Sequence, residues 1–160
     1  AGKPSKIANF QAFVTENFFL ENTFRIGNVN TKTFLLMLAQ HAPKSFISGQ
    51  SVDLEKTLKA ANRSEFHHIM PRDFLEKTSQ KGIYGDSPLA NFCFLSRSDN
   101  RKIGGSAPSE YKSLMPTDLL KLDNILSSSI IPNIVFKDDY HSFLKERSEL
   151  LKNEANKLTS

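Results

Sequence analysis

The sequence predicts a mostly helical α+β domain with a short β-hairpin and a following helix at its centre, flanked by N-terminal and C-terminal helices. Apolar residues recur every three or four positions towards both ends of the chain, which is the period of an amphipathic helix. Residues 65–69 and 91–95 are instead short aromatic runs bounded by turn residues, as strands are. Ser96 follows the second run and can cap a helix.

Three helices are expected before the first strand. The first covers residues 5–20, where phenylalanine and other apolar residues recur at helical spacing. The second covers residues 31–40 and is capped by Asn30 or Thr31. The third covers residues 51 to about 61 and has acidic side chains in its first turn.

Two more helices are expected in the C-terminal part of the chain. One follows the cap signal Thr117-Asp118 and ends at the serines of residues 127–129, and the other covers residues 140–156. The buried stripe of this last helix is expected to consist of Phe143, Leu144, Leu150 and Leu151. Its solvated face is expected to consist of Lys145, Glu146, Arg147, Glu149, Lys152 and Glu154.

The composition narrows the class of protein. With 160 residues, of which 39% are hydrophobic, the chain is long enough for one domain with a sizeable core. No apolar run approaches the roughly 18 residues that a membrane span needs, so we expect no membrane partner. The single cysteine, Cys93, excludes an internal disulfide and a cysteine-rich zinc knuckle, and it fits a reducing cytoplasm. The net charge of +4 slightly favours a polyanionic partner, although many ordinary basic proteins have a similar charge.

Four polar residues in the centre of the chain form a candidate site. His67 and His68 are adjacent in the first strand, Asn91 opens the second strand, and Asn100 follows nine residues later. Each has an ordinary explanation, because a histidine pair can be buried against backbone carbonyls and an asparagine can begin a strand or cap a helix. In this order, however, they indicate metal-dependent phosphodiester cleavage. Histidine titrates near neutrality and can take a proton from water, and a metal can neutralise the charge that develops on the phosphate.

This order of residues resembles the HNH, or ββα-metal, nucleases, in which a hairpin and a helix hold one divalent metal. Residues 66–71 (Phe-His-His-Ile-Met-Pro) resemble the first strand of that motif, and residues 90–95 (Ala-Asn-Phe-Cys-Phe-Leu) resemble the second. Together with Pro108 and Tyr111, they look more narrowly like the C-terminal nuclease domain of GmrSD-type modification-dependent restriction enzymes. The resemblance covers residues 31–115 and implies that the central hairpin and helix form a ββα-metal core.

The resemblance implies a role for each member of the candidate site. His68 takes the place of the general base, and Asn91 takes the place of the residue that bonds the turn after it and fixes the imidazole. His67 and Asn100 take the places of the metal ligands. An imidazole and a neutral amide oxygen suit Mg²⁺ or Mn²⁺ better than tightly held Zn²⁺, although Zn²⁺ or Ni²⁺ can occupy such sites in crystals.

The resemblance also suggests further ligands and contacts to double-stranded DNA. Asp99, Glu65 or water is expected to complete the ligands of the metal. Five cations near the motif are candidates for phosphate contacts, although a plain exposed cation is an equally good interpretation of each. They are Arg63, Arg72, Arg97, Arg101 and Lys102.

We expect a single HNH-type nuclease domain over residues 1–160, with N-terminal helices in 1–62, the ββα-metal core in 63–105 and C-terminal helices in 106–160. Its expected activity is that of a metal-dependent DNA endonuclease or nickase, the cytoplasmic effector of bacterial restriction or anti-phage defence. The chain does not begin with Met, so we expect it to be the C-terminal part of a larger protein whose nucleotide-hydrolysing or sensor domain is missing here. Two alternatives are a non-catalytic DNA-binding module that keeps the hairpin and a bacteriocin-type toxin nuclease.

Overall fold

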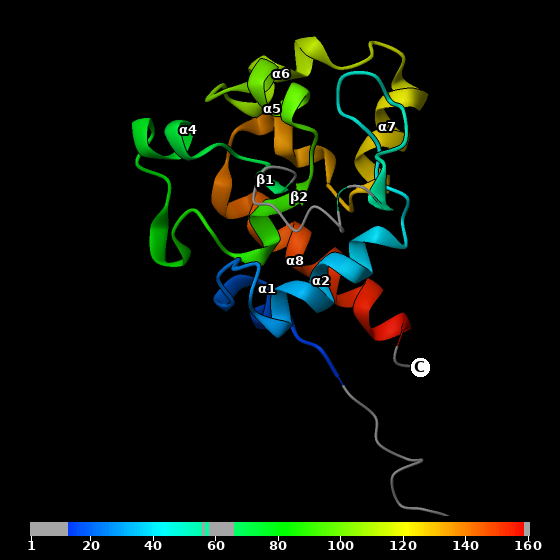
Figure 1. The fold of residues 1–160 in the computed structure, drawn as a ribbon. Coiled ribbons are helices and arrows are strands. Elements are labelled where there is room, and N and C mark those ends of the chain that lie inside the picture. Colours follow the sequence, from blue (N-terminus) through cyan, green and yellow to red (C-terminus); the bar gives the residue numbers. More distant parts are fainter. Residues whose placement is uncertain (1–12, 56, 58–65, 159–160) are drawn as a thin grey trace, which may run out of the picture.

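The computed structural model describes residues 13–55, 57 and 66–158, and it is a mostly helical α+β fold (Figure 1). In the described part of the chain, seven helices surround one two-stranded antiparallel sheet. The helices are α1 (Glu16–Glu21), α2 (Val29–Ala39), α4 (Arg72–Lys77), α5 (Arg97–Ile103), α6 (Pro108–Tyr111), α7 (Leu119–Ser128) and α8 (Tyr140–Lys157). The strands are β1 (Phe66–His68) and β2 (Phe92–Phe94), and the short 3-10 helices are η2 (Gly82–Tyr84), η3 (Leu89–Asn91), η4 (Lys112–Leu114) and η5 (Asn133–Lys137).

The first expected helix is shorter than its sequence pattern suggests. Residues 1–12 lie outside the described residues, and α1 begins only after Thr15, so the prediction is wrong for residues 13–15. Phe13 explains the difference, because its side chain is 77% exposed and no core lies beneath it. An apolar residue at helical spacing stabilises a helix only where it has a surface to pack against.

The next two helices begin at other residues than the sequence indicates. The side chain of Asn28 caps α2 by accepting a hydrogen bond from the backbone N–H of Asn30, so the helix begins two residues earlier than expected. Ser51 forms an isolated β-bridge with Lys44 and does not cap a helix. The third expected helix therefore begins later, and residues 56 and 58–65, which include its expected end, lie outside the described residues.

The hairpin lies at the centre of the fold, with α5 and α6 above it and α1, α2 and α8 below it in Figure 1. In its register His67 pairs with Cys93 and His68 pairs with Phe92. All three residues of β2 are buried, as expected for a strand between two layers. Burial raises the pKa of the Cys93 thiol to about 12, so this cysteine is a small core side chain and not a nucleophile.

The C-terminal helix α8 follows the predicted span closely. Asp139 caps it by accepting a hydrogen bond from the backbone N–H of Ser142. Phe143, Leu144 and Leu151 are buried as expected, but Leu150 is 39% exposed. Leu150 therefore lies beside the buried stripe and not within it. None of the helices in the described ranges is both long enough and apolar enough to cross a membrane.

Arg147 is the largest departure from the expected solvated face of α8. Its side chain is 0% exposed. The guanidinium donates four hydrogen bonds, at 2.6–3.0 Å, to the carbonyl oxygens of Ala90, Phe92, Ser129 and Ile130. Burial lowers the pKa of Arg147 to about 10, so the group remains charged at neutral pH. The backbone carbonyls stand in for a counter-ion, and they join α8 to the start of β2 and to the end of α7.

Candidate functional site

Asn91 holds the backbone that directly follows His68. It is the last residue of η3 and is fully buried, so it precedes β2 and does not open the strand as expected. Its Oδ1 accepts a hydrogen bond from the Met70 N–H at 3.0 Å, and its Nδ2 donates to the Met70 carbonyl at 3.1 Å and to the Asp86 carbonyl at 2.9 Å. The predicted bond from Asn91 to the turn after His68 is therefore present.

Two residues from the C-terminal half support the same turn. The phenol of Tyr111 donates to the Ile69 carbonyl at 2.9 Å in the buried interior. Arg147 donates to the carbonyls of Ala90 and Phe92, which flank Asn91 on both sides. The turn and the asparagine that holds it are thus each fixed by a second buried group.

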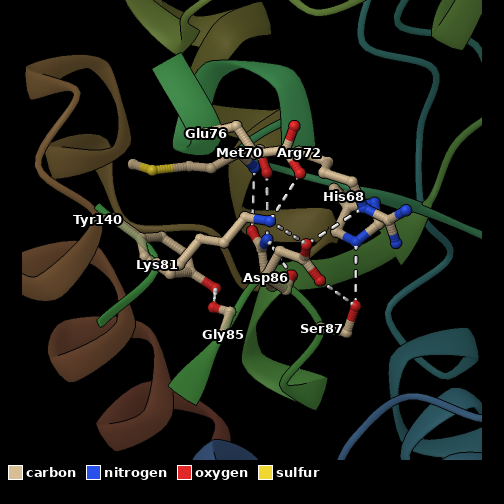
Figure 2. Close-up of polar contacts among 10 residues, drawn as sticks. His68, Met70, Arg72, Glu76, Lys81, Gly85, Asp86, Ser87 and Tyr140 are labelled. Atoms are coloured by element: carbon tan, nitrogen blue, oxygen red, sulfur yellow. Dashed lines mark hydrogen bonds and ion pairs between the residues drawn. The ribbon is translucent and has the colours of Figure 1, made fainter. Parts of the chain in front are cut away.

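His68 ends β1 with a half-buried imidazole that contacts the ring of Phe92, the centroids lying 4.4 Å apart. Its Nε2 lies 3.5 Å from the Ser87 Oγ, at the outer limit of a hydrogen bond. The Ser87 hydroxyl donates at 2.6 Å to the Asp86 carboxylate (Figure 2). Because the serine proton is directed to Asp86, the Oγ presents a lone pair to His68. This arrangement favours the tautomer with the proton on Nε2 and leaves Nδ1 as the basic nitrogen.

The surroundings of His68 favour its neutral form. The pKa of His68 is lowered to about 4, chiefly by burial; the charge of Asp86 opposes this shift, and the charges of Arg72, His67 and Lys81 add to it. The imidazole is therefore unprotonated at neutral pH, which is the state that a general base requires.

Asp86 is the centre of a small charge network beside His68 (Figure 2). Its Oδ2 pairs with the Arg72 Nε and with the Lys81 Nζ, each at 3.1 Å. Burial raises the pKa of Asp86, but the hydrogen bonds from Ser87 and Lys81 and the charge of Arg72 outweigh it, and the net pKa is lowered. Asp86 thus stays ionised at neutral pH. In the sequence, Asp86 and Ser87 appear only as an acid next to a hydroxyl in a segment of turn residues.

A pocket of about 690 Å³ opens beside the histidine pair. His67 and His68 both line this pocket. Successive residues within a strand point to opposite faces, but β1 ends at His68, so this alternation does not continue there. The remaining lining residues combine aromatic side chains, two arginines and part of the loop between α1 and α2. They are Phe24, Arg25, Ile26, Gly27, Phe66, Arg72 and Phe92.

The two predicted metal ligands, His67 and Asn100, do not line one pocket among the described residues. Asn100 lies on α5, half-buried, and its carboxamide has no hydrogen-bond partner in the described part of the chain. It is not among the described residues that line the pocket of His67. Across residues 13–55, 57 and 66–158, no three His, Cys, Asp or Glu side chains are grouped so that they could hold a metal ion. A metal here would therefore depend on His67, on Asn100 and on water.

Of the two carboxylates expected as additional ligands, Asp99 does not line the histidine pocket. Asp99 is 5% exposed, accepts a hydrogen bond from the Ser45 hydroxyl at 2.6 Å and lines a second pocket. It also occupies the first turn of α5, where the Ser96 hydroxyl accepts from its backbone N–H. Glu65 lies outside the described residues.

The predicted phosphate contacts are distributed over two places. Arg72 lines the pocket of the histidine pair and is paired with Asp86. Arg97 and Lys102 line the second pocket, beside Asp99, and Arg101 is exposed on α5. Arg63 lies outside the described residues.

No family model, no curated protein and no solved structure matches this chain. The likeness to the HNH nucleases accordingly remains a prediction based on the motif residues.

Proposed function

We propose that this chain is a metal-dependent nuclease that hydrolyses phosphodiester bonds in double-stranded DNA, as an endonuclease or a nickase. The observation that carries the proposal is the pair of hydrogen bonds between the Asn91 side chain and the Met70 backbone, because they fix the backbone that follows His68. The imidazole next to this fixed turn lines an open pocket. A rigid support for one solvent-facing histidine is what general-base catalysis needs.

His68 acts in this proposal on the attacking water. Its Nε2 is directed to Ser87, so Nδ1 takes a proton from the water as the water attacks phosphorus. The resulting imidazolium is stabilised by the nearby charge of Asp86, which favours the protonated ring. A general base of this kind contributes about 10²–10⁴ in rate.

The pocket also suits the substrate's charge. Of the described residues that line it, none carries a carboxylate, whereas Arg25 and Arg72 are cationic. A phosphodiester is an anion at neutral pH, so it is attracted to this wall and meets no acid there.

The metal would be held by His67 and by the amide oxygen of Asn100. The unpaired carboxamide of Asn100 supports this assignment, because no described group competes for its oxygen. One imidazole and one amide oxygen leave several positions for water, as Mg²⁺ and Mn²⁺ prefer. When bound, such a metal neutralises charge on the phosphate and on the leaving oxygen.

A second candidate is a non-catalytic DNA-binding module with the same hairpin. The observation that favours it is the position of Asn100 outside the described lining of the histidine pocket. Such a module would bind DNA but would not cleave it, whichever divalent metal is added. A place in bacterial defence, with a nucleotide-hydrolysing domain in a longer protein, is proposed on the motif resemblance alone.

A plasmid-nicking assay with Mg²⁺ or Mn²⁺, with and without EDTA, tests the proposal. The wild-type chain is expected to convert supercoiled plasmid into nicked or linear forms, and EDTA is expected to stop it. His68→Ala is expected to lose this activity, whereas the exposed His141→Ala serves as a matched histidine control and keeps it. DNA binding without cleavage in either metal would favour the non-catalytic module, and full cleavage by His68→Ala would contradict the proposed base.

A further inference from the structure

The loop between α1 and α2 is attached to the strand that carries the site. The Phe24 N–H donates to the Ser87 carbonyl at 2.8 Å. The ring of Phe24 stacks on Phe92, with centroids 4.0 Å apart and planes inclined by 10°. Phe92 is the strand partner of His68. The loop is thus placed relative to His68 by both a backbone bond and a ring stack.

Arg25 is the next residue of this loop, and hydrogen bonds hold both its backbone N–H and its backbone carbonyl. Its N–H donates to the Thr31 hydroxyl at 3.0 Å, and its carbonyl accepts from the Asn28 N–H at 2.8 Å. Its exposed guanidinium lines the histidine pocket and forms no ion pair within the described part of the chain. Arg72, the other arginine of the pocket, differs because its Nε is already paired with Asp86.

The charge of this pocket points to an anion. Two histidines and two arginines line it, and none of its described lining residues is acidic. A guanidinium presents its donors as a planar fork that matches two oxygens of a phosphate. Arg25 can therefore offer its whole guanidinium to a phosphate, whereas the Nε of Arg72 is already engaged by Asp86.

We propose that Arg25 is a phosphate-binding residue of the histidine pocket and that it holds the phosphodiester group of the substrate beside His68. The anion site itself follows from the pocket and its charges. The identity of the anion as a DNA phosphate rests on the proposed function. Arg25 belongs to the loop before α2, far in sequence from the hairpin, so nothing in the candidate motif identifies it.

Titration with inorganic phosphate, followed by backbone amide NMR of the whole chain, tests the anion site without DNA or metal. Amide signals of residues 25–27 and 67–68 are expected to shift and saturate in the wild type. Arg25→Ala is expected to weaken binding roughly fivefold, as for loss of one partly exposed charged contact. Arg25→Lys keeps the positive charge but loses the planar fork of donors, so its affinity for phosphate is expected to lie between those of the wild type and Arg25→Ala. Lys121→Ala on α7 is exposed, removes the same charge elsewhere and is expected to behave as wild type.

Gly27 offers an independent test in the same pocket. A Cβ added there would meet nothing within 4 Å, so a side chain can be accommodated without a clash. Gly27→Glu places a negative charge at the pocket and is expected to weaken phosphate binding, whereas Gly27→Gln has the same shape and is expected to weaken it less. Equal phosphate affinity in these two variants, or in Arg25→Ala and wild type, would overturn the proposal.

A DNA experiment separates this proposal from the nuclease assignment. With a short labelled duplex and no metal, Arg25→Ala is expected to bind DNA less tightly than Lys121→Ala. The slope of log affinity against log salt concentration is expected to be smaller by about one in Arg25→Ala than in Lys121→Ala. If phosphate binds through Arg25 but plasmid is never cut, the anion site stands and the proposed function fails. If plasmid is cut but Arg25→Ala matches Lys121→Ala in both binding experiments, the nuclease stands and the role of Arg25 is refuted.

Discussion

Asn91 binds both backbone groups of Met70, accepting from its N–H at 3.0 Å and donating to its carbonyl at 3.1 Å. The two bonds hold both sides of the Met70 backbone, two residues after His68. Because Asn91 is fully buried, no solvent molecule replaces these bonds when they are lost. The carboxamide of Asn91 is therefore one main support of the end of β1, beside the phenol of Tyr111 on the Ile69 carbonyl.

Asn91→Ala is expected to destabilise the fold by about 3 kcal/mol, because it leaves two groups of Met70 and the carbonyl of Asp86 without their partner. Urea denaturation of the variant and the wild type measures the difference. Asn100→Ala is the matched control, since its carboxamide makes no hydrogen bond to the described residues, and its stability is expected to change by less than about 0.5 kcal/mol. Equal losses in the two variants would contradict the structural role of Asn91.

Arg147→Met is expected to lower stability by about 3 kcal/mol or more, because four buried carbonyls lose a charged donor. Arg147→Lys is expected to recover only part of this loss, since one ammonium cannot reach all four. Denaturant midpoints provide the measurement, and Lys145→Met on the exposed face of α8 is the control. A midpoint for Arg147→Met that matches the control would show that the buried network is not formed.

The low pKa of His68 predicts a loss of stability in acid. The folded pKa is about 4, below the usual value of 6.5, so the unfolded chain binds more protons between these values. The stability contributed by the neutral imidazole is therefore complete above about pH 6.5 and falls as the pH drops towards 4, by about 3 kcal/mol at most.

Urea denaturation at neutral pH and at about pH 4.5 checks this prediction. His68→Gln removes the titrating group and is expected to show a smaller loss of stability between the two conditions. The same loss in the variant and the wild type would show that other groups cause the acid sensitivity.

Ser87→Ala is expected to change the tautomer of His68 without unfolding the protein. The wild-type ring is expected to carry its proton on Nε2, because the Ser87 Oγ faces that nitrogen and gives its own proton to Asp86. Nitrogen chemical shifts of the imidazole report the tautomer. In a cleavage assay kcat is expected to fall with little change in KM, and Ser87→Thr is expected to restore it. An unchanged ring spectrum in Ser87→Ala would remove the positioning role of Ser87.

The hairpin was predictable because its two strands are compact aromatic runs between turn residues. The support from Asn91 was also predictable, since the motif resemblance assigns this residue to the turn after His68. The two long helices of the C-terminal part, α7 and α8, followed from apolar spacing and, for α7, from the cap signal at Asp118. These features depend on local sequence, which a single chain displays directly.

Other features depend on contacts between distant segments, and the sequence shows no sign of them. Arg147 sits in a run of charged residues and looks solvated, but its acceptors are backbone carbonyls of residues 90, 92, 129 and 130. Asp86 and Ser87 look like ordinary turn residues, and only the fold brings them to His68. Arg25 joins the pocket for the same reason.

The measurement that tests the central claim most directly is a metal titration of plasmid cleavage by His67→Ala and His68→Ala. Both variants are expected to be inactive at low Mn²⁺. Raised Mn²⁺ is expected to restore part of the activity of His67→Ala, because that variant lacks a metal ligand. It is not expected to rescue His68→Ala, because the missing function is proton transfer, worth about 10²–10⁴ in rate. Rescue of His68→Ala alone would show that the two roles are reversed, and cleavage by both variants at the wild-type rate would contradict the nuclease assignment.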